Sequence, residues 1–150
     1  MRTKEPSRDT DRAVLAPPRR AVRDLMTEDV VSMSPGDTLA DLADRMADEN
    51  IRHMPIVDRD GDLVGFVTDR ELAELVRGVP LSLQRDLLGS RRVREIMPTE
   101  IDTVEPDQSL REAAQMLLEN KVGGLPVVEG SHLVGILTES DFVRLYVESA

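Results

Sequence analysis

The sequence predicts an α/β protein in which two repeated β-α-β-β-α units pack sheet to sheet with pseudo-two-fold symmetry. Residues 30–58 align with residues 101–129 without a gap, at an offset of 71. The alignment resumes at Leu63 and Leu133 with an offset of 70, because the second copy has lost one residue in a turn. A duplicated unit is typical of a fold with internal symmetry. Each copy alone would expose one face of its small sheet, so we expect the two copies to pack against each other.

We expect each copy to begin with a short strand and a helix. The strand is predicted at 30–33 in the first copy and at 101–104 in the second, and a proline follows each of them. A helix is predicted from Leu39 and from Leu110, because apolar residues recur there at i, i+3, i+4, i+7 and i+8. That spacing places the apolar side chains along one helix face, which can then cover the sheet.

Two further strands and a final helix complete each copy. In the first copy the strands "MPIV" and "LVGFV" flank the turn "DRDGD"; in the second, "LPVV" and "LVGIL" flank "EGSH". The final helix is predicted to start after Thr68 and after Thr138. Residues 77–92 separate the copies, and "LSLQRDLLG" within them predicts one or two helical turns that stop at Gly89. We interpret 77–92 as a surface linker.

The composition limits the core and the partners. Hydrophobic residues make up 40% of the chain but aromatic residues only 2%, so Leu, Val, Ile, Met and Ala must form the core. The net charge of −10 repels phosphate backbones, so nucleic acid is not an expected partner. Residues 1–20 lack apolar periodicity and contain three prolines, which predicts a disordered N-terminal arm.

Neither a catalytic nor a metal site is expected. The chain has no cysteine, which excludes disulfides and thiolate metal sites and fits a cytoplasmic location. No apolar run approaches the length of about 18 residues that a membrane span needs, so no membrane partner is expected. The two histidines lie at non-equivalent positions, and the motifs GxSxG, HExxH, GxxxxGK[ST] and GxGxxG are missing. We therefore expect a protein that is not an enzyme and requires no cofactor.

One motif recurs where the last strand of each copy meets its final helix. Its pattern is Gly-x-x-Thr-x-x-Asp or Glu, formed by Gly135, Thr138 and Asp141 in the second copy and by Gly65, Thr68 and Glu71 in the first. One interpretation is structural: the threonine caps the helix and the acid interacts with the helix dipole. The other is a ligand site. A strand glycine permits close approach, a carboxylate accepts two hydrogen bonds from a ribose, and a helix N-terminus suits a phosphate. The spacing leaves both interpretations open.

Residues 22–147 resemble a tandem pair of CBS domains, also called a Bateman module. The resemblance rests on "VRDLMTEDVVSMSPGDTLADLADRMADENIRHMPIVDRDGDLVGFVTDREL" and its counterpart from Val93. It implies one module over 21–150, with CBS repeat 1 at 21–76, the linker at 77–92 and CBS repeat 2 at 93–150. It also implies two clefts between the repeats that often bind AMP, ADP, ATP or S-adenosylmethionine, and a flat homodimer.

The resemblance implies that each cleft takes its ribose end from one repeat and its base end from the other. One cleft would comprise Thr138, Ser140, Asp141, Ile51, Arg52 and His53. The other would comprise Thr68, Arg70, Glu71, Val122, Gly123 and Gly124. We expect the first cleft to be the better site, because Arg52 or His53 could meet a phosphate there while Ile51 packs on the base. In the second cleft, Glu71 carries its carboxylate one methylene further out, although Arg70 could compensate for the lost cations.

Three functional hypotheses follow. The first is a regulatory module that binds an adenosyl ligand and signals by changing its shape or its dimer. The second is a homodimeric interaction module that needs no ligand. The third is a regulatory subunit that acts in trans on an enzyme or a transporter. An acidic ligand motif beside an apolar cleft favours the first hypothesis over the second.

Overall fold

The computed structural model describes residues 20–149. The helices are α2 (Leu39–Glu49), α3 (Asp69–Leu75), α4 (Leu81–Gly89), α5 (Leu110–Asn120) and α6 (Glu139–Ser149). The strands are β1 (His53–Val57), β2 (Leu63–Thr68), β3 (Gly124–Glu129) and β4 (His132–Thr138), and single 3-10 turns lie at Val22–Asp24 and Val93–Glu95. The disordered arm predicted at 1–20 lies outside the described residues except for Arg20, whose carbonyl accepts a hydrogen bond from the Leu110 N–H (N···O 3.0 Å).

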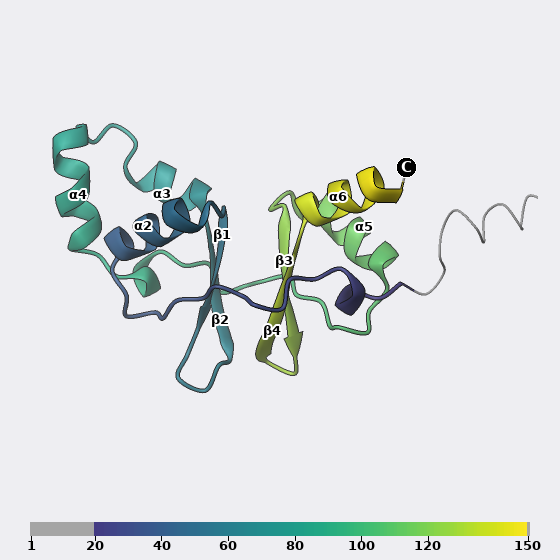
Figure 1. Cartoon of the computed structure of the whole chain (residues 1–150). Coiled ribbons are helices and arrows are strands. Elements are labelled where there is room, and N and C mark those ends of the chain that lie inside the picture. Colours follow the sequence, from purple (N-terminus) through teal and green to yellow (C-terminus); the bar gives the residue numbers. More distant parts are fainter. Residues whose placement is uncertain (1–19, 150) are drawn as a thin grey trace, which may run out of the picture.

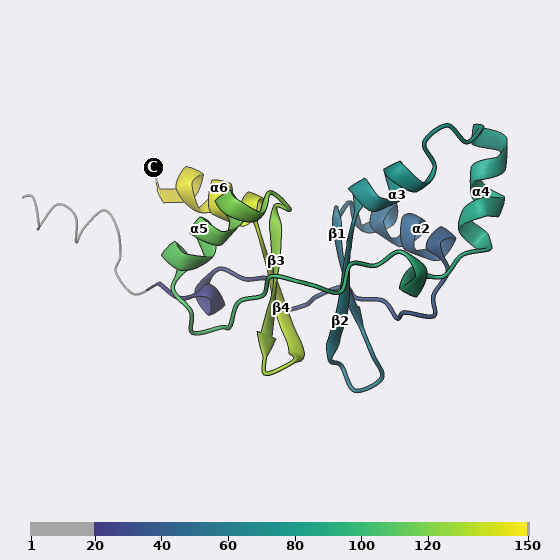
Figure 2. The same cartoon turned by 180° about the vertical axis from the view of Figure 1, so that it is seen from behind.

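Two antiparallel hairpins form the centre of the molecule. β1 pairs with β2 and β3 with β4, and the hairpins stand next to each other with α2, α3 and α4 outside one and α5 and α6 outside the other (Figures 1 and 2). Their turns are joined, since the Leu63 N–H donates to Ser131 O (2.8 Å) and the Leu133 N–H to Gly61 O (3.1 Å). The predicted fold class of two repeated α/β units is confirmed.

The strand predicted to open each repeat is wrong in extent. Only Met33 and Val104 form bridges, parallel to Ile56 and Val127. The reason lies in the path of the chain. Thr27 pairs with Ile136 of the other hairpin, so residues 28–32 must cross from one hairpin to the other. Because the crossing segment is short, only one residue at each of its ends, Thr27 and Met33, pairs with a strand.

The 3-10 turn that opens each repeat, called here its leading turn, packs in the core of the other repeat. The leading turns are Val22–Asp24 and Val93–Glu95. Val22 is fully buried in the core beneath β3 and β4, where Leu25 and Met26 pack beside it. Val93 is fully buried in the core beneath β1 and β2, together with Ile96 and Met97. Because the leading turns are exchanged, neither repeat has a complete core of its own.

The helix predicted between the repeats is α4, and it ends at Gly89 as expected. It lies against α2, where the Arg85 guanidinium donates two hydrogen bonds of 2.8 Å to the Asp44 carboxylate. These hydrogen bonds hold the pKa of Asp44 below its usual value. Leu88 packs on the core of the first repeat. Within residues 20–149 no helix combines the length and the apolar composition needed to cross a membrane.

Truncating either exchanged valine should destabilise both repeats together. Val22→Ala and Val93→Ala should each lower the free energy of unfolding by about 2 kcal/mol, because each removes two buried methyl groups. Amide hydrogen exchange of Val22→Ala should show lost protection in both hairpins. Val147→Ala, at a position with 65% of its surface exposed, is the control and should change stability by less than about 0.5 kcal/mol. Loss of protection in only one hairpin would contradict the shared core.

Candidate functional site

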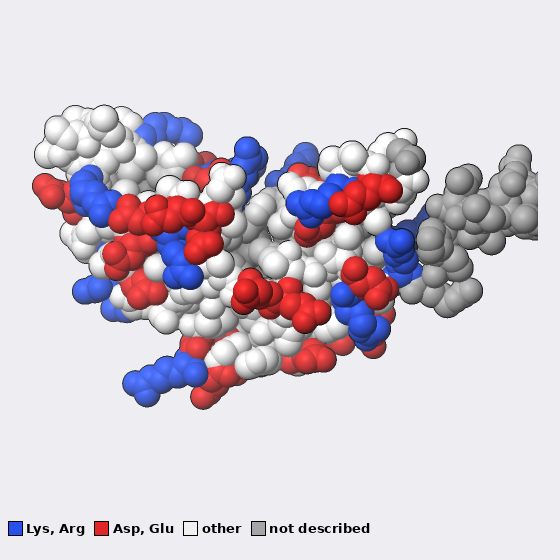
Figure 3. All heavy atoms as spheres, viewed as in Figure 1, with Lys and Arg blue, Asp and Glu red and all other residues white. Residues whose placement is uncertain are grey.

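Two clefts lie between the repeats. The larger, called here the Asp141 cleft, has a volume of about 660 Å³. The smaller, called the Glu71 cleft, has a volume of about 340 Å³. The molecular surface is notched between the helices of the two halves, with charged side chains on both rims (Figure 3). All six residues predicted for the larger cleft line it together: Thr138, Ser140, Asp141, Ile51, Arg52 and His53.

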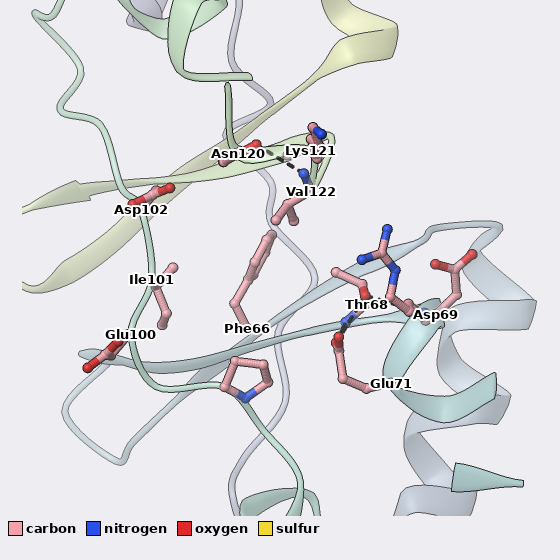
Figure 4. A pocket seen from close by; sticks show the side chains of 13 residues that line it. Phe66, Thr68, Asp69, Glu71, Glu100, Ile101, Asp102, Asn120, Lys121 and Val122 are labelled. Atoms are coloured by element: carbon pink, nitrogen blue, oxygen red, sulfur yellow. Dashed lines mark hydrogen bonds between the residues drawn. The ribbon is translucent and has the colours of Figure 1, made fainter. Parts of the chain in front are cut away.

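Five of the six residues predicted for the other cleft line the Glu71 cleft, and the sixth does not. The five are Thr68, Arg70, Glu71, Val122 and Gly124 (Figure 4). Gly123 instead lines the Asp141 cleft. Gly123 has a left-handed conformation (φ 82°), and its carbonyl accepts a hydrogen bond from the Glu139 N–H at the start of α6 (3.0 Å).

The acid of each motif caps its own helix. Asp141 is buried, and its Oδ2 accepts hydrogen bonds from the Thr138 N–H (2.8 Å) and hydroxyl (3.2 Å). Glu71 makes the same pair of hydrogen bonds, since its Oε1 accepts from the Thr68 N–H (2.6 Å) and hydroxyl (3.0 Å). Although the Glu71 side chain is one methylene longer, its carboxylate therefore bonds the N-cap residue in the same way as that of Asp141.

The motif glycines are explained by packing within the protein. A Cβ on Gly135 would lie 2.7 Å from Met26 Sδ and 3.1 Å from Thr27 O. A Cβ on Gly65 would collide with the side chain of Met97. In both cases the segment that approaches the strand is the leading segment of the other repeat. The glycines therefore serve the exchanged core, and they are not evidence for a ligand.

At the base end of the Asp141 cleft, His53 reaches across to the second repeat. Its Nε2 lies 2.8 Å from Val122 O, so Nε2 carries the proton and donates it to the carbonyl. Its ring stacks on Phe66, with ring centroids 5.7 Å apart and an interplanar angle of 13°. Arg52 is exposed at the same end, and Ile51 is half-buried against the core. The cleft thus combines a cation, an apolar side chain and a fixed imidazole.

Among the cleft residues that sequence reasoning missed, Arg144 and Phe66 have the largest bearing on ligand binding. Arg144 lines the Asp141 cleft and donates a hydrogen bond of 3.1 Å to Asp141 Oδ1, although its side chain is 59% exposed. The signal was available, because residues three apart on a helix are neighbours. Phe66 lines the Glu71 cleft. No pattern in the sequence singled it out.

The turn between β1 and β2 carries a cluster of three carboxylates whose ligand atoms lie within 4.8 Å of one another, on Asp58, Asp60 and Asp62. Asp58 Oδ1 accepts hydrogen bonds from the backbone N–H groups of Asp60 (2.9 Å) and Asp62 (3.0 Å). An aspartate that bonds backbone groups just after it stabilises a tight turn. The turn accounts for the position of Asp58.

Comparison with known families matches two stretches of the chain. The family described as "CBS domain" matches residues 22–78 and 93–148. The CBS domain-containing protein YhcV of Bacillus subtilis is 34% identical over 121 residues, which cover 81% of both chains. Homoserine O-acetyltransferase of Methanohalobium evestigatum is 29% identical over 85% of this chain, but the match spans only 24% of that enzyme's length.

Two similar solved structures hold adenosyl compounds. The CBS domain pair of protein MJ0100, in complex with 5'-methylthioadenosine and S-adenosyl-L-methionine, has a TM-score of 0.76 and 25% identity, and the match covers 89% of this chain and 100% of that one. CBSX2 of Arabidopsis thaliana, in complex with AMP, has a TM-score of 0.74 and 29% identity, with 85% and 96% covered.

The helix cap formed by Asp141 should contribute measurably to stability. Asp141→Ala should lower the free energy of unfolding in urea by about 2 kcal/mol, because the Thr138 N–H loses a charged acceptor. Asp141→Asn keeps an acceptor and should cost only about half as much. Asp48→Ala on the exposed face of α2 is the control, with a change below about 0.5 kcal/mol. An equal effect of Asp141→Ala and Asp48→Ala would show that the cap is energetically unimportant.

Proposed function

The chain belongs to the CBS domain family and carries two of its domains in tandem, and on this premise we propose that it is a regulatory module that binds an adenosyl ligand in the Asp141 cleft. One observation carries the proposal. A single cleft combines a buried carboxylate at a helix start, an apolar residue and two arginines contributed by opposite repeats. Its volume is within the usual range of small-molecule sites.

The ligand spans the two repeats. Its ribose hydroxyls donate to Asp141 beside the Thr138 cap, and the base packs on Ile51 at the other end of the cleft. A phosphate or carboxylate on the ligand meets Arg52 or Arg144, because guanidinium groups bind planar anions with paired hydrogen bonds. Arg144 already bonds Asp141 Oδ1 (3.1 Å). It therefore has to share that oxygen with the ribose or turn toward the phosphate.

The similar structures support the ligand class. CBSX2 binds AMP, and the MJ0100 pair binds two adenosyl compounds that lack phosphate. The three ligands have the adenine base and its ribose ring in common, which is the part of the ligand that Asp141 and Ile51 would contact in this chain. The group attached to the ribose differs among them, so we assign the adenosyl class rather than one compound.

A second candidate is an interaction module that works without a ligand, as a homodimer or as a regulatory subunit of an enzyme or transporter. One observation favours it. Large apolar side chains are exposed on neighbouring helices of the second repeat: Leu118 on α5, and Val143, Tyr146 and Val147 on α6. Exposed apolar patches of this kind mark interaction surfaces. A ligand-driven module also needs such a surface, so the two candidates differ in whether a ligand binds.

Adenosyl ligands should stabilise the protein through Asp141. Among AMP, ADP, ATP and S-adenosylmethionine, at least one at 100 times its dissociation constant should add about 2.7 kcal/mol and raise the melting temperature by several degrees. Asp141→Asn should abolish this shift, because the amide offers the ribose only one acceptor atom. Glu71→Gln is the matched control in the other cleft and should keep the shift. No shift with any compound would favour the ligand-independent module.

Arg52 should select ligands that carry phosphate. Arg52→Ala should weaken ATP or AMP binding about tenfold by removing a charged hydrogen bond, and should leave adenosine binding unchanged in calorimetry. Arg59→Ala, in the exposed turn after β1, carries the same charge change outside the cleft and serves as the control. Equal losses for adenosine and for the phosphorylated ligands would place the phosphate away from Arg52.

A further inference from the structure

The residues at the rims suggest that the Glu71 cleft should be the larger of the two, but it is the smaller. At equivalent positions the Asp141 cleft has His53 and the Glu71 cleft has Gly124. A glycine in place of a histidine should widen a cleft. The Glu71 cleft is nevertheless smaller, about 340 Å³ against 660 Å³. Some other side chain must fill the space.

That side chain is Phe66 on β2. The equivalent position on β4 is Ile136, and each residue lines the cleft of its own repeat's motif. In Figure 4 the ring of Phe66 stands in the middle of the cleft, between Ile101 and Thr68. Pro55 lines the large cleft, whereas the equivalent Pro126 does not line the small one, which Phe66 lines instead.

His53 completes the closure. Its ring stacks on Phe66 and its Nε2 is bonded to Val122 O (2.8 Å), which fixes the ring in place. A Cβ on Gly124 would lie 2.9 Å from His53 Cδ2, so the imidazole occupies the space that this glycine leaves open. His53 lines the Asp141 cleft and Phe66 the Glu71 cleft. The two stacked rings therefore form the wall between the clefts.

We propose that the Phe66–His53 stack narrows the base end of the Glu71 cleft too far for an adenine ring to enter, so that each chain binds a single adenosyl ligand and residue 66 determines this stoichiometry. The ligand class rests on the proposed function, but the closure rests on the rings themselves. The polar end of the Glu71 cleft is otherwise formed as in the Asp141 cleft. Glu71 accepts a hydrogen bond from the Thr68 N–H, as Asp141 does from the Thr138 N–H. Removing the phenyl ring should open a second site.

The test is isothermal titration calorimetry with AMP, ATP and S-adenosylmethionine. The wild type should bind one molecule per chain. Phe66→Ile, which copies the residue of the other repeat, should bind two, and the double variant with Glu71→Gln should bind one again. Phe142→Leu changes the other phenylalanine of the chain, which packs on the core of the second repeat, and should still bind one. Phe66→Leu is a milder second variant in case Phe66→Ile does not fold.

The outcomes separate this proposal from the proposed function. Two molecules on the wild type, or one on a folded Phe66→Ile protein, would overturn the closure and leave the adenosyl function standing. No binding to the wild type with one molecule on Phe66→Ile would overturn the Asp141 site and support the closure. No binding to either protein would overturn both.

A ligand-free measurement tests the stack directly. In the NMR spectrum, the ring protons of His53 should move downfield in Phe66→Ile, because a stacked phenyl ring shields the protons above it. They should stay in place in Phe142→Leu. Unchanged His53 resonances in a folded Phe66→Ile protein would show that the rings are not stacked in solution and would overturn the proposal.

Discussion

The exchange of leading turns between the two cores is the constraint on which the rest of the structure depends. Val22 and Val93 are each buried in the core of the opposite repeat. The exchange forces the chain to cross twice between the hairpins, and the crossing segments pack against Gly65 and Gly135. The repeats cannot separate without opening both cores. The clefts between them therefore have fixed walls, which lowers the ordering cost of ligand binding.

The same groups that build the helix caps form the polar end of each cleft. A carboxylate that already accepts two hydrogen bonds from Thr138 is held in one rotamer, so it is preorganised for a ligand. The stability role of Asp141 and its proposed binding role are consequently difficult to separate by an alanine substitution. An asparagine at position 141 separates them better, because one amide oxygen can satisfy the cap N–H but cannot also bind a pair of hydroxyl groups.

The local structure could be predicted from the sequence, and the long-range packing could not. Apolar periodicity located the helices at Leu39 and Leu110, since one apolar face is a local property. The residues that meet in the Asp141 cleft were indicated by the resemblance to tandem CBS domains, and the spacing of the motif alone left the ligand site open. Nothing local shows that Val22 enters the distant core, and this exchange shortened the opening strands. The position of Phe66 in the Glu71 cleft could not be predicted locally either. Its ring stacks on His53, 13 residues earlier in the chain, and His53 is in turn bonded to Val122 of the opposite repeat.

The duplicated sequence has produced two unlike clefts, and the difference is concentrated where the repeats touch. Differences on outer helix faces leave the clefts unchanged, but Phe66 and His53 lie in the wall that both clefts share. A ligand in the Asp141 cleft would contact α6 at its first turn, and the same helix exposes Val143, Tyr146 and Val147 further along. One continuous helix, Glu139–Ser149, therefore carries both the first-turn residues of the candidate site and that apolar surface. α6 thus connects the candidate ligand site to the surface where a partner would bind.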